Sequence, residues 1–291
     1  MANFEKNHPL NLAGPLFVDT TCIDCGTCYH LGPEIFKEKK NQSTIAKQPE
    51  NLNEWSAAKR AMVSCPTNSI GVKAAPEIFK SAEINLPLLI SENVYYCGYT
   101  SKDSYGASSY LIVRPEGNYL IDSPRFGAHL VSEFEKLGGI HSMFLTHQDD
   151  VADHALFAEH FKCQRVIHEA DVNGDTQDVE HILKTSELPQ DWDHDLKIIP
   201  VPGHTRGHIA FLYQNKFLFS GDHIFYDPDS QELTSSKGVC WYSWTEQIKS
   251  TKSLLQEDFE WIMPGHGGWG HLGSQQMKHA LENLIQKMEQ K

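Results

Sequence analysis

Four of the seven cysteines lie in the first quarter of the sequence, and three of these are evenly spaced. They read Cys22-Ile-Asp-Cys25-Gly-Thr-Cys28, and Cys65-Pro66 follows much later in the chain. Three thiolates at this spacing can wrap one face of an iron–sulfur cubane, because the intervening backbone amides turn towards the sulfides. A fourth thiolate from a distant point completes the ligand set, and the proline after it fixes the exit of the chain. The pattern predicts one [4Fe–4S] cluster held by Cys22, Cys25, Cys28 and Cys65.

The same thiolates could instead hold a structural zinc ion. Zinc sites usually pair two separate CxxC motifs, whereas here the motifs overlap and the fourth cysteine is remote, which favours the cluster. Residues 14–73 resemble the single-cluster members of the bacterial ferredoxin family. Gly32 precedes Pro33 at the place where two-cluster ferredoxins have a cysteine, so the resemblance implies one cluster. Electron transfer and simple stabilisation of the fold are both open as its role.

Histidine and aspartate gather in four further motifs, each directly after an apolar run that we expect to be a strand. The motifs read THQDD at 146–150, PGHTRGH at 202–208, SGDH at 220–223 and PGHG at 264–267. Turns that follow neighbouring strands can meet around a metal ion, and these side chains are typical metal ligands. Each of these residues alone could be a hydrogen-bonded core residue. Their combination predicts a second metal site containing His147, Asp149, His204, Asp222 and His266.

From about residue 94 to the C-terminus, the order of these motifs resembles the metallo-β-lactamase superfamily. The resemblance implies an αββα sandwich whose edge holds one or two divalent ions of zinc, iron or manganese. It implies that His204 binds the first metal, that His266 binds the second and that Asp222 bridges them. Asp122 matches an aspartate that usually supports the ligands from behind.

The first motif departs from the family pattern His-x-His-x-Asp-His. With His147 as the first histidine, Asp149 replaces the second, and the last two places hold valine and alanine, which cannot bind a metal. A two-residue insertion would bring Asp153 and His154 to those places. In a third alignment His147 takes the role of the second histidine and Asp149 that of the next aspartate. His147 and Asp149 are therefore ligand candidates in every alignment, and Asp153 and His154 in one.

A purely structural explanation also exists for the acidic residues of this motif. Carboxylates favour helix N-termini, and a helix is expected at residues 151–162. Its cap could be supplied by Asp149, Asp150 or Asp153. On that helix His154 should face inward, because it shares a stripe with two phenylalanines.

The two cysteine and histidine patterns lie in segments of different character. The first eighty or so residues contain no long strand, whereas from residue 94 short β-rich runs alternate with helical stretches, with helices expected at 127–137, 151–162, 244–256 and 274–289. We therefore predict an α+β protein of two domains. Residues 1–83 form a small ferredoxin-like iron–sulfur domain, and residues 84–291 form the αββα metallo-β-lactamase sandwich.

The formal net charge of −13 limits which kinds of partner the protein is expected to bind. Such a surface repels phosphate backbones and anionic lipids, which disfavours nucleic acid and membranes. No secretory signal is expected at the start, and no apolar stretch approaches the ~20 residues that span a bilayer. Clustered cysteines without a signal point to a reducing compartment. We expect a cytoplasmic protein with a small-molecule substrate and, if the cluster transfers electrons, a redox partner protein.

Three functions follow from the combined resemblances. Hydrolysis by metal-bound hydroxide is the commonest activity of the superfamily and is favoured, with Asp222 and Asp149 as the catalytic carboxylates. The alternative is a redox enzyme whose diiron site receives electrons from the cluster, as in the flavodiiron proteins, which also have a carboxylate at the position of Asp149 and reduce oxygen or nitric oxide. A non-catalytic electron carrier or redox sensor is the third possibility. The pocket rim is expected to be aromatic, from Tyr226, Trp241 and Tyr242.

Overall fold

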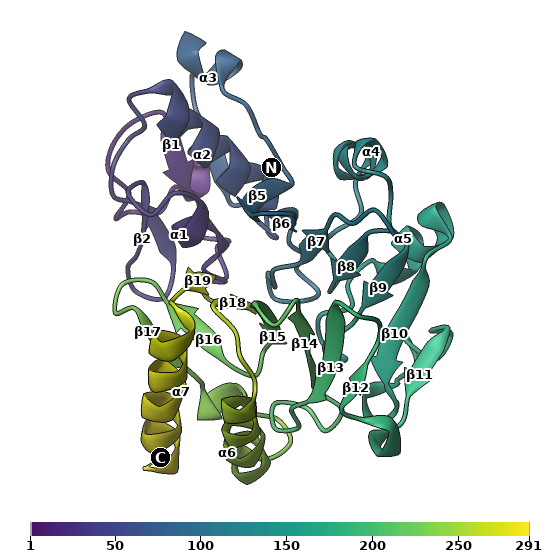
Figure 1. Ribbon diagram of the computed structural model, residues 1–291. Coiled ribbons are helices and arrows are strands. Elements are labelled where there is room, and N and C mark those ends of the chain that lie inside the picture. Colours follow the sequence, from purple (N-terminus) through teal and green to yellow (C-terminus); the bar gives the residue numbers. More distant parts are fainter. Residues whose placement is uncertain (1, 291) are drawn as a thin grey trace. The chain divides into compact units, whose positions relative to one another are not determined.

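The computed structural model describes residues 2–290 and contains two compact units. The first unit runs to Asn118 and includes Pro124–Gly139, and the second comprises Tyr119–Ser123 and the chain from Ile140 onward. Figure 1 shows the chain coloured along its sequence. The predicted domain boundary between residues 83 and 84 lies inside the first unit, and it stays a prediction about where the ferredoxin-like sequence ends.

The first unit is built from short elements. In chain order these are η1 (Phe4–Lys6), β1 (Leu16–Val18), α1 (Thr27–Leu31), β2 (Phe36–Glu38), β3 (Ser43–Ile45), α2 (Leu52–Ser64), β4 (Ile70–Val72), α3 (Glu77–Ser81), β5 (Leu88–Ser91), β6 (Val94–Tyr96), β7 (Tyr110–Ile112) and α4 (Ala128–Lys136). β1 pairs with β4 and β2 with β3, both antiparallel. β5, β6 and β7 form an antiparallel meander.

Helix α2 positions the fourth cluster cysteine. It begins after Asn51, whose side chain accepts a hydrogen bond from the backbone N–H of Glu54. Such a cap satisfies one of the unpaired amides at a helix start. One face of the helix, including Trp55, is buried. The helix ends at Ser64, so Cys65 and Pro66 leave it directly and Cys65 is held at a packed helix end.

The second unit contains the longer strands. Its elements are β8 (Tyr119–Ile121), β9 (Ser142–Phe144), α5 (His154–Phe161), β10 (Gln164–His168), η2 (Glu169–Asp171), β11 (His181–Leu183), η3 (Thr185–Glu187), β12 (Gln190–Asp191), β13 (Leu196–Pro200), β14 (Ile209–Tyr213), β15 (Phe217–Gly221), β16 (Phe225–Asp227), β17 (Glu232–Thr234), η4 (Lys237–Val239), α6 (Trp244–Ser253), η5 (Leu254–Gln256), β18 (Trp261–Pro264), β19 (Gly270–His271) and α7 (Ser274–Glu289). β8, β9, β10 and β11 pair in parallel. A separate six-stranded sheet has the order β12-β13-β14-β15-β18-β19.

These two sheets of the second unit face each other across an aromatic core. The ring of Phe144 on β9 lies 5.3 Å from that of Phe211 on β14 and 5.3 Å from that of Trp192. All five residues of β14 and all five of β15 are buried, as expected for central strands with both faces covered. The packing fixes the strand ends, and the predicted ligands His147, Asp149, His204, Asp222 and His266 follow β9, β13, β15 and β18.

Helices α6 and α7 contact each other, and α7 packs against the six-stranded sheet (Figure 1). The buried stripe of α7 contains Met277, Leu281, Leu284, Ile285 and Met288, spaced three or four residues apart. This spacing is typical of a helix with one face on a core. Among the described residues, no helix is both long and apolar enough to cross a membrane.

The predicted helices at 127–137, 244–256 and 274–289 match α4, α6 with η5, and α7 closely. The helix expected at 151–162 begins only at His154. Val151 is buried and Ala152 has a φ of +32°, so the chain turns here before the helix starts. Because the helix starts late, the turn at Val151 and Ala152 separates residues 147–150 from Asp153 and His154.

Candidate metal centres

The four cysteines of the first motif line one small cavity in the first unit. Cys22 and Cys25 lie on the loop that enters α1, Cys28 is in the first turn of that helix, and Cys65 follows α2. Gly26 has a φ of +82°, a conformation that glycine adopts without steric cost. This residue allows the loop to curl around the cavity, so that cysteines on both sides of it face the same space.

Hydrogen-bond donors are directed at the cysteine sulfurs. The Sγ of Cys22 accepts from the backbone N–H groups of Asp24 and Ser43, each at 3.4 Å, and the Sγ of Cys65 accepts from that of Ser69 at 3.3 Å. Such bonds stabilise thiolates that ligate iron and tune the potential of a cluster.

Burial has the opposite effect on the free thiols. It raises the pKa of Cys25 to about 11 and raises that of Cys28 well above its usual range. Buried thiolates are therefore stable only when cations compensate their charge. Four sulfurs around one cavity with inward N–H donors fit one cubane cluster.

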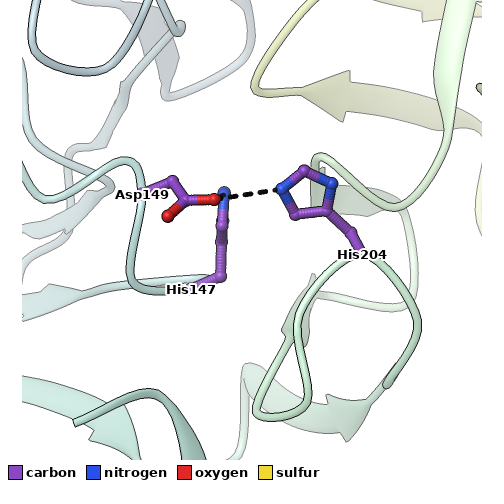
Figure 2. Close-up of side chains that lie close together, drawn as sticks. All are labelled: His147, Asp149 and His204. Atoms are coloured by element: carbon purple, nitrogen blue, oxygen red, sulfur yellow. Dashed lines mark ion pairs between the residues drawn. The ribbon is translucent and has the colours of Figure 1, made fainter. Parts of the chain in front are cut away.

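The second candidate centre lies at strand ends of the second unit. His147 and Asp149 follow β9, and His204 lies between β13 and β14 (Figure 2). The Oδ2 of Asp149 is 3.4 Å from the Nε2 of His204 and 3.9 Å from the Nε2 of His147. Donors that share one metal ion at about 2.1 Å lie at such separations. These three side chains form one possible ligand set.

A second set surrounds Asp222, which follows β15. Donor atoms of His147, Asp150 and Asp222 lie within 4.8 Å of one another. The Oδ2 of Asp222 is 3.8 Å from the Nε2 of His204 and 3.5 Å from the Nε2 of His266. Asp222 thus lies between the two outer histidines, which is the position expected of a bridging carboxylate.

Several donor atoms of this group are buried without a hydrogen-bond partner in the described structure. They are the Nε2 of His147, both ring nitrogens of His204, the Oδ2 of Asp150 and the Oδ1 of Asp222. Each such atom costs about 1–3 kcal/mol when left unpaired. Divalent cations would satisfy them, so the residues fit the metals that the sequence predicts.

A hydrogen-bond relay orients His147. The hydroxyl of Thr146 donates to the carboxylate of Asp122 at 3.0 Å, and its oxygen lies 2.9 Å from the Nδ1 of His147. Because the hydroxyl proton points to Asp122, the oxygen accepts from an Nδ1–H of the histidine. This tautomer leaves the lone pair of His147 on Nε2, which faces the candidate metal site.

His208 supports two candidate ligands at once. Its ring stacks on that of His147 with centroids 4.7 Å apart, and its Nε2 accepts from the backbone N–H of Asp222 at 3.1 Å. Burial lowers the pKa of His208 well below the usual value, so it is neutral and can accept this bond.

The structure places the residues of the first motif in different surroundings. Asp150, expected only as a possible helix cap, lies in the candidate site and is 2% exposed. Burial, and next the charge of Asp222, raise the pKa of Asp150 well above its usual range. A carboxyl in this environment suits a bound cation.

Asp153 and His154 are not brought into the site. Asp153 is the residue before α5. The Nδ1 of His154 lies 3.1 Å from the guanidinium of Arg165, and its Nε2 lies 3.2 Å from the carbonyl oxygen of Asp175. Both ring nitrogens of His154 are thus occupied by protein groups. Among the described residues neither Asp153 nor His154 belongs to a group of donor atoms that could hold a metal, whereas Asp150 does; the alignment with a two-residue insertion stays a prediction.

Asp171 is a supporting residue that no motif indicated. Its Oδ1 accepts from the backbone N–H of Gly207 at 2.6 Å, and its Oδ2 accepts from the backbone N–H of Gln148 at 3.2 Å and from the hydroxyl of Thr205. These contacts tie the loop of His147 to the loop of His204. Asp171 lies just past the end of β10, and this place after a strand was the one available signal.

The aromatic rim is smaller than expected. Tyr226 is buried and packs against Gly270, whereas Trp241 is 65% exposed. The backbone N–H of Trp241 donates to the carbonyl oxygen of His204 at 2.9 Å. The neighbouring imidazole of His204 is the main cause that lowers the pKa of Asp149. Trp241 therefore lies at the open side of the group.

Comparisons with known proteins agree with both halves. Residues 18–72 match the family described as the 4Fe-4S single cluster domain of Ferredoxin I. A probable metallo-hydrolase of Methanocaldococcus jannaschii is 29% identical over 195 residues, which are 57% of this chain and 90% of the relative.

Solved structures show the fold of the larger part. VMB-1 superposes with a TM-score of 0.54 at 19% identity, covering 70% of this chain and 95% of its own. The BLEG-1 B3 metallo-β-lactamase superposes with a TM-score of 0.51 at 17% identity, and the match covers 64% of this chain and 97% of that structure. A metallo-β-lactamase from Pontibacter korlensis superposes with a TM-score of 0.51 at 18% identity, and the match covers 70% of this chain and 98% of that structure. The protein thus joins an N-terminal single-cluster ferredoxin-type domain to a metallo-β-lactamase fold, the α+β architecture expected from its sequence.

Proposed function

We propose that this protein is a metal-dependent hydrolase that acts on a small molecule. The observation that carries the proposal is the group of buried, unpaired donor atoms on neighbouring strand ends. The resemblance to a probable metallo-hydrolase supports the same class of reaction. The residues that would hold the metals are His147, Asp149, Asp150, His204, Asp222 and His266.

Bound divalent cations would supply the main chemistry, because they lower the pKa of water towards 7 and polarise a carbonyl or phosphoryl oxygen. The protein side chains would position the reactants. Asp222 lies between His204 and His266 and holds the centre of the group. Asp149 lies at the solvent-exposed side of the group of candidate ligands, since its side chain is 43% exposed. One of its oxygens faces His147 and His204 (Figure 2), and the other would orient a water molecule at this exposed side.

A redox reaction is the second candidate, and the donor set favours it. Three carboxylates and three histidines make a harder ligand set than a histidine-rich one, which shifts the metal preference from zinc towards iron or manganese. An iron–sulfur domain in the same chain offers a source of electrons. Under this hypothesis a diiron site would reduce oxygen or nitric oxide, and a redox partner protein would reload the cluster.

Metal analysis of anaerobically purified protein separates the candidates. About four iron ions plus one or two zinc ions per chain would support the hydrolase, and hydrolysis of thioesters, lactones and phosphodiesters would then be assayed. About six iron ions with oxygen or nitric oxide consumption would support the redox enzyme. A reducible cluster without turnover in either assay would point to an electron carrier or sensor.

Variants connect the activity to the site. His204→Ala should abolish turnover while the electron paramagnetic resonance signal of the reduced cluster persists. His279→Ala is a suitable control, because this histidine is on α7 with its side chain 73% exposed. Equal activity of the His204 variant and the wild type would refute the assignment of the reaction to this site.

A further inference from the structure

The loop between β6 and β7 contacts the iron–sulfur site. We call residues 97–107 the strap. The strap follows the ferredoxin-type match at residues 18–72, and no motif in it suggests a role. Its residues belong to the same compact unit as the four cysteines.

Gly106 makes the closest approach. A Cβ added to this glycine would lie 2.6 Å from the Cβ of Cys25, 2.8 Å from its Sγ and 3.3 Å from the Cγ of Pro66. Gly106 also has a φ of +88°, so a side chain here would be strained as well as crowded. Only a glycine lets the strap lie directly on Cys25 and on the residue after Cys65.

Three hydrogen bonds anchor the strap to segments that carry the cluster cysteines. The hydroxyl of Thr27 donates to the carbonyl oxygen of Gly106 at 3.2 Å, in the buried interior. The hydroxyl of Tyr105 donates to the carbonyl oxygen of Ile23 at 2.6 Å, between Cys22 and Cys25. The hydroxyl of Thr100 donates to the carbonyl oxygen of Ser64 at 2.7 Å, directly before Cys65.

The strap is also ordered by its own bonds. Gly106 N–H donates to the carbonyl oxygen of Ser101 at 2.8 Å, and Ala107 N–H donates to that of Ser104 at 2.9 Å. Thr100, Ser101, Ser104 and Ala107 are at most 5% exposed, whereas Tyr105 is 56% exposed. The strap is therefore a compact loop with a buried inner side and one tyrosine on its outer side.

We propose that the strap is a wall of the iron–sulfur site that shields the Cys25 and Cys65 side of the cluster from solvent. Exposure to solvent is one of the factors that set the potential and the oxidative stability of a cluster. Residues outside the ferredoxin motif thereby control how long the cluster survives in air and how readily it is reduced. This inference does not depend on the reaction catalysed at the second site.

The test compares full-length variants by three readouts: iron per chain, the rate at which the visible absorbance bleaches in air, and the midpoint potential of the cluster. In Gly106→Ala the new methyl group must displace Cys25 or the strap. We expect reduced iron content, bleaching faster by roughly threefold or more, and a higher potential, because water that gains access stabilises the additional negative charge of the reduced, thiolate-ligated cluster. Tyr105→Phe keeps the ring and loses the bond to Ile23, so a smaller change in the same direction is expected.

Gly138→Ala is the matched control. Gly138 also has a positive φ, +103°, but its added Cβ would meet only the Nδ2 of Asn118, at 3.5 Å. It imposes similar backbone strain in the same unit without touching a cysteine. Metal content of the second site reports whether each variant is folded. The proposal fails if Gly106→Ala and Tyr105→Phe both match the wild type, or if Gly138→Ala is impaired as much as Gly106→Ala while Tyr105→Phe is unaffected.

Discussion

The carboxylate of Asp122 accepts two kinds of hydrogen bond from Thr146, one from its backbone N–H at 2.8 Å and the others from its hydroxyl at 3.0 Å. Burial, and to a smaller extent the charge of Asp222, raise the pKa of Asp122 to about 8. Thr146 is thus held by the buried carboxyl of Asp122, and its hydroxyl in turn fixes the orientation of the His147 ring.

Replacing Thr146 should weaken metal binding at the second site. In Thr146→Val the hydroxyl that accepts from the Nδ1–H of His147 is lost, and the ring is free to adopt the wrong tautomer. Loss of such an outer partner typically costs about 10–100-fold in metal affinity. Competition with a chelator of known affinity measures the effect. Thr146→Ser keeps the hydroxyl and should bind metal like the wild type; equal losses in both variants would contradict the relay.

Asp171 should be essential for the geometry of two loops. Asp171→Ala leaves the N–H groups of Gly207 and Gln148 and the hydroxyl of Thr205 without their acceptor. We expect a loss of about 2–4 kcal/mol in the free energy of unfolding and a reduced metal content of the second site. Denaturant titration and metal analysis test this. Asp178→Ala, at an exposed position, is the control. Similar results for both variants would argue against the proposed role of Asp171 in joining the two loops.

The sequence predicts those parts of the sites that depend on spacing or on strand ends. The cysteine ligands could be named because CxxCxxC places three sulfurs on one short loop. His147, His204, Asp222 and His266 could be named because turns after neighbouring strands meet, and the structure brings their side chains together.

Contacts set by packing could not be predicted. That Asp150 lies among the candidate ligand atoms while Asp153 does not depends on the turn at Val151 and Ala152, after which the helix begins at His154. The bond from Thr27 to Gly106 joins residues 79 positions apart, and glycine at such a place has no motif. These contacts depend on tertiary structure, and local sequence contains no pattern for them.

Asp150 and His154 should differ in what their removal changes. Asp150→Ala removes one donor of the Asp222 set and should lower the metal content of the second site. His154→Ala should leave that content unchanged and instead reduce stability by about 1–3 kcal/mol, because the buried guanidinium of Arg165 loses an acceptor. Metal analysis and denaturant titration of both variants decide this. Loss of metal in the His154 variant alone would instead support the alignment with a two-residue insertion, in which His154 is a metal ligand.

Glu180 should make stability depend on pH. Partial burial acts to raise its pKa, but the hydrogen bonds from Arg165 prevail and lower the pKa of Glu180 from 4.5 to about 2. A carboxyl with a lowered pKa stabilises the fold above pH 4.5, and the contribution is lost as the pH falls towards 2. Because its side chain is 32% exposed, we expect only about 1 kcal/mol.

The measurement for Glu180 is the difference in the free energy of unfolding between the wild type and Glu180→Gln, from pH 7 to pH 2.5. The difference should be constant above pH 5 and shrink below pH 4.5, since both proteins share every other titrating group. A difference that does not change over this range would show that the ion pair with Arg165 does not stabilise the fold.

Trp241 should report metal binding at the second site. Its ring centroid is 6.1 Å from that of His204, one of the candidate metal ligands. A paramagnetic divalent cation such as Co²⁺ should therefore quench its fluorescence when added to protein whose second site has been emptied by a chelator. In Trp241→Phe most of this quenching should disappear, although the metal still binds. Trp244→Phe, at the start of α6, should keep the quenching. Undiminished quenching in the Trp241 variant would place the bound metal away from His204 and Asp149.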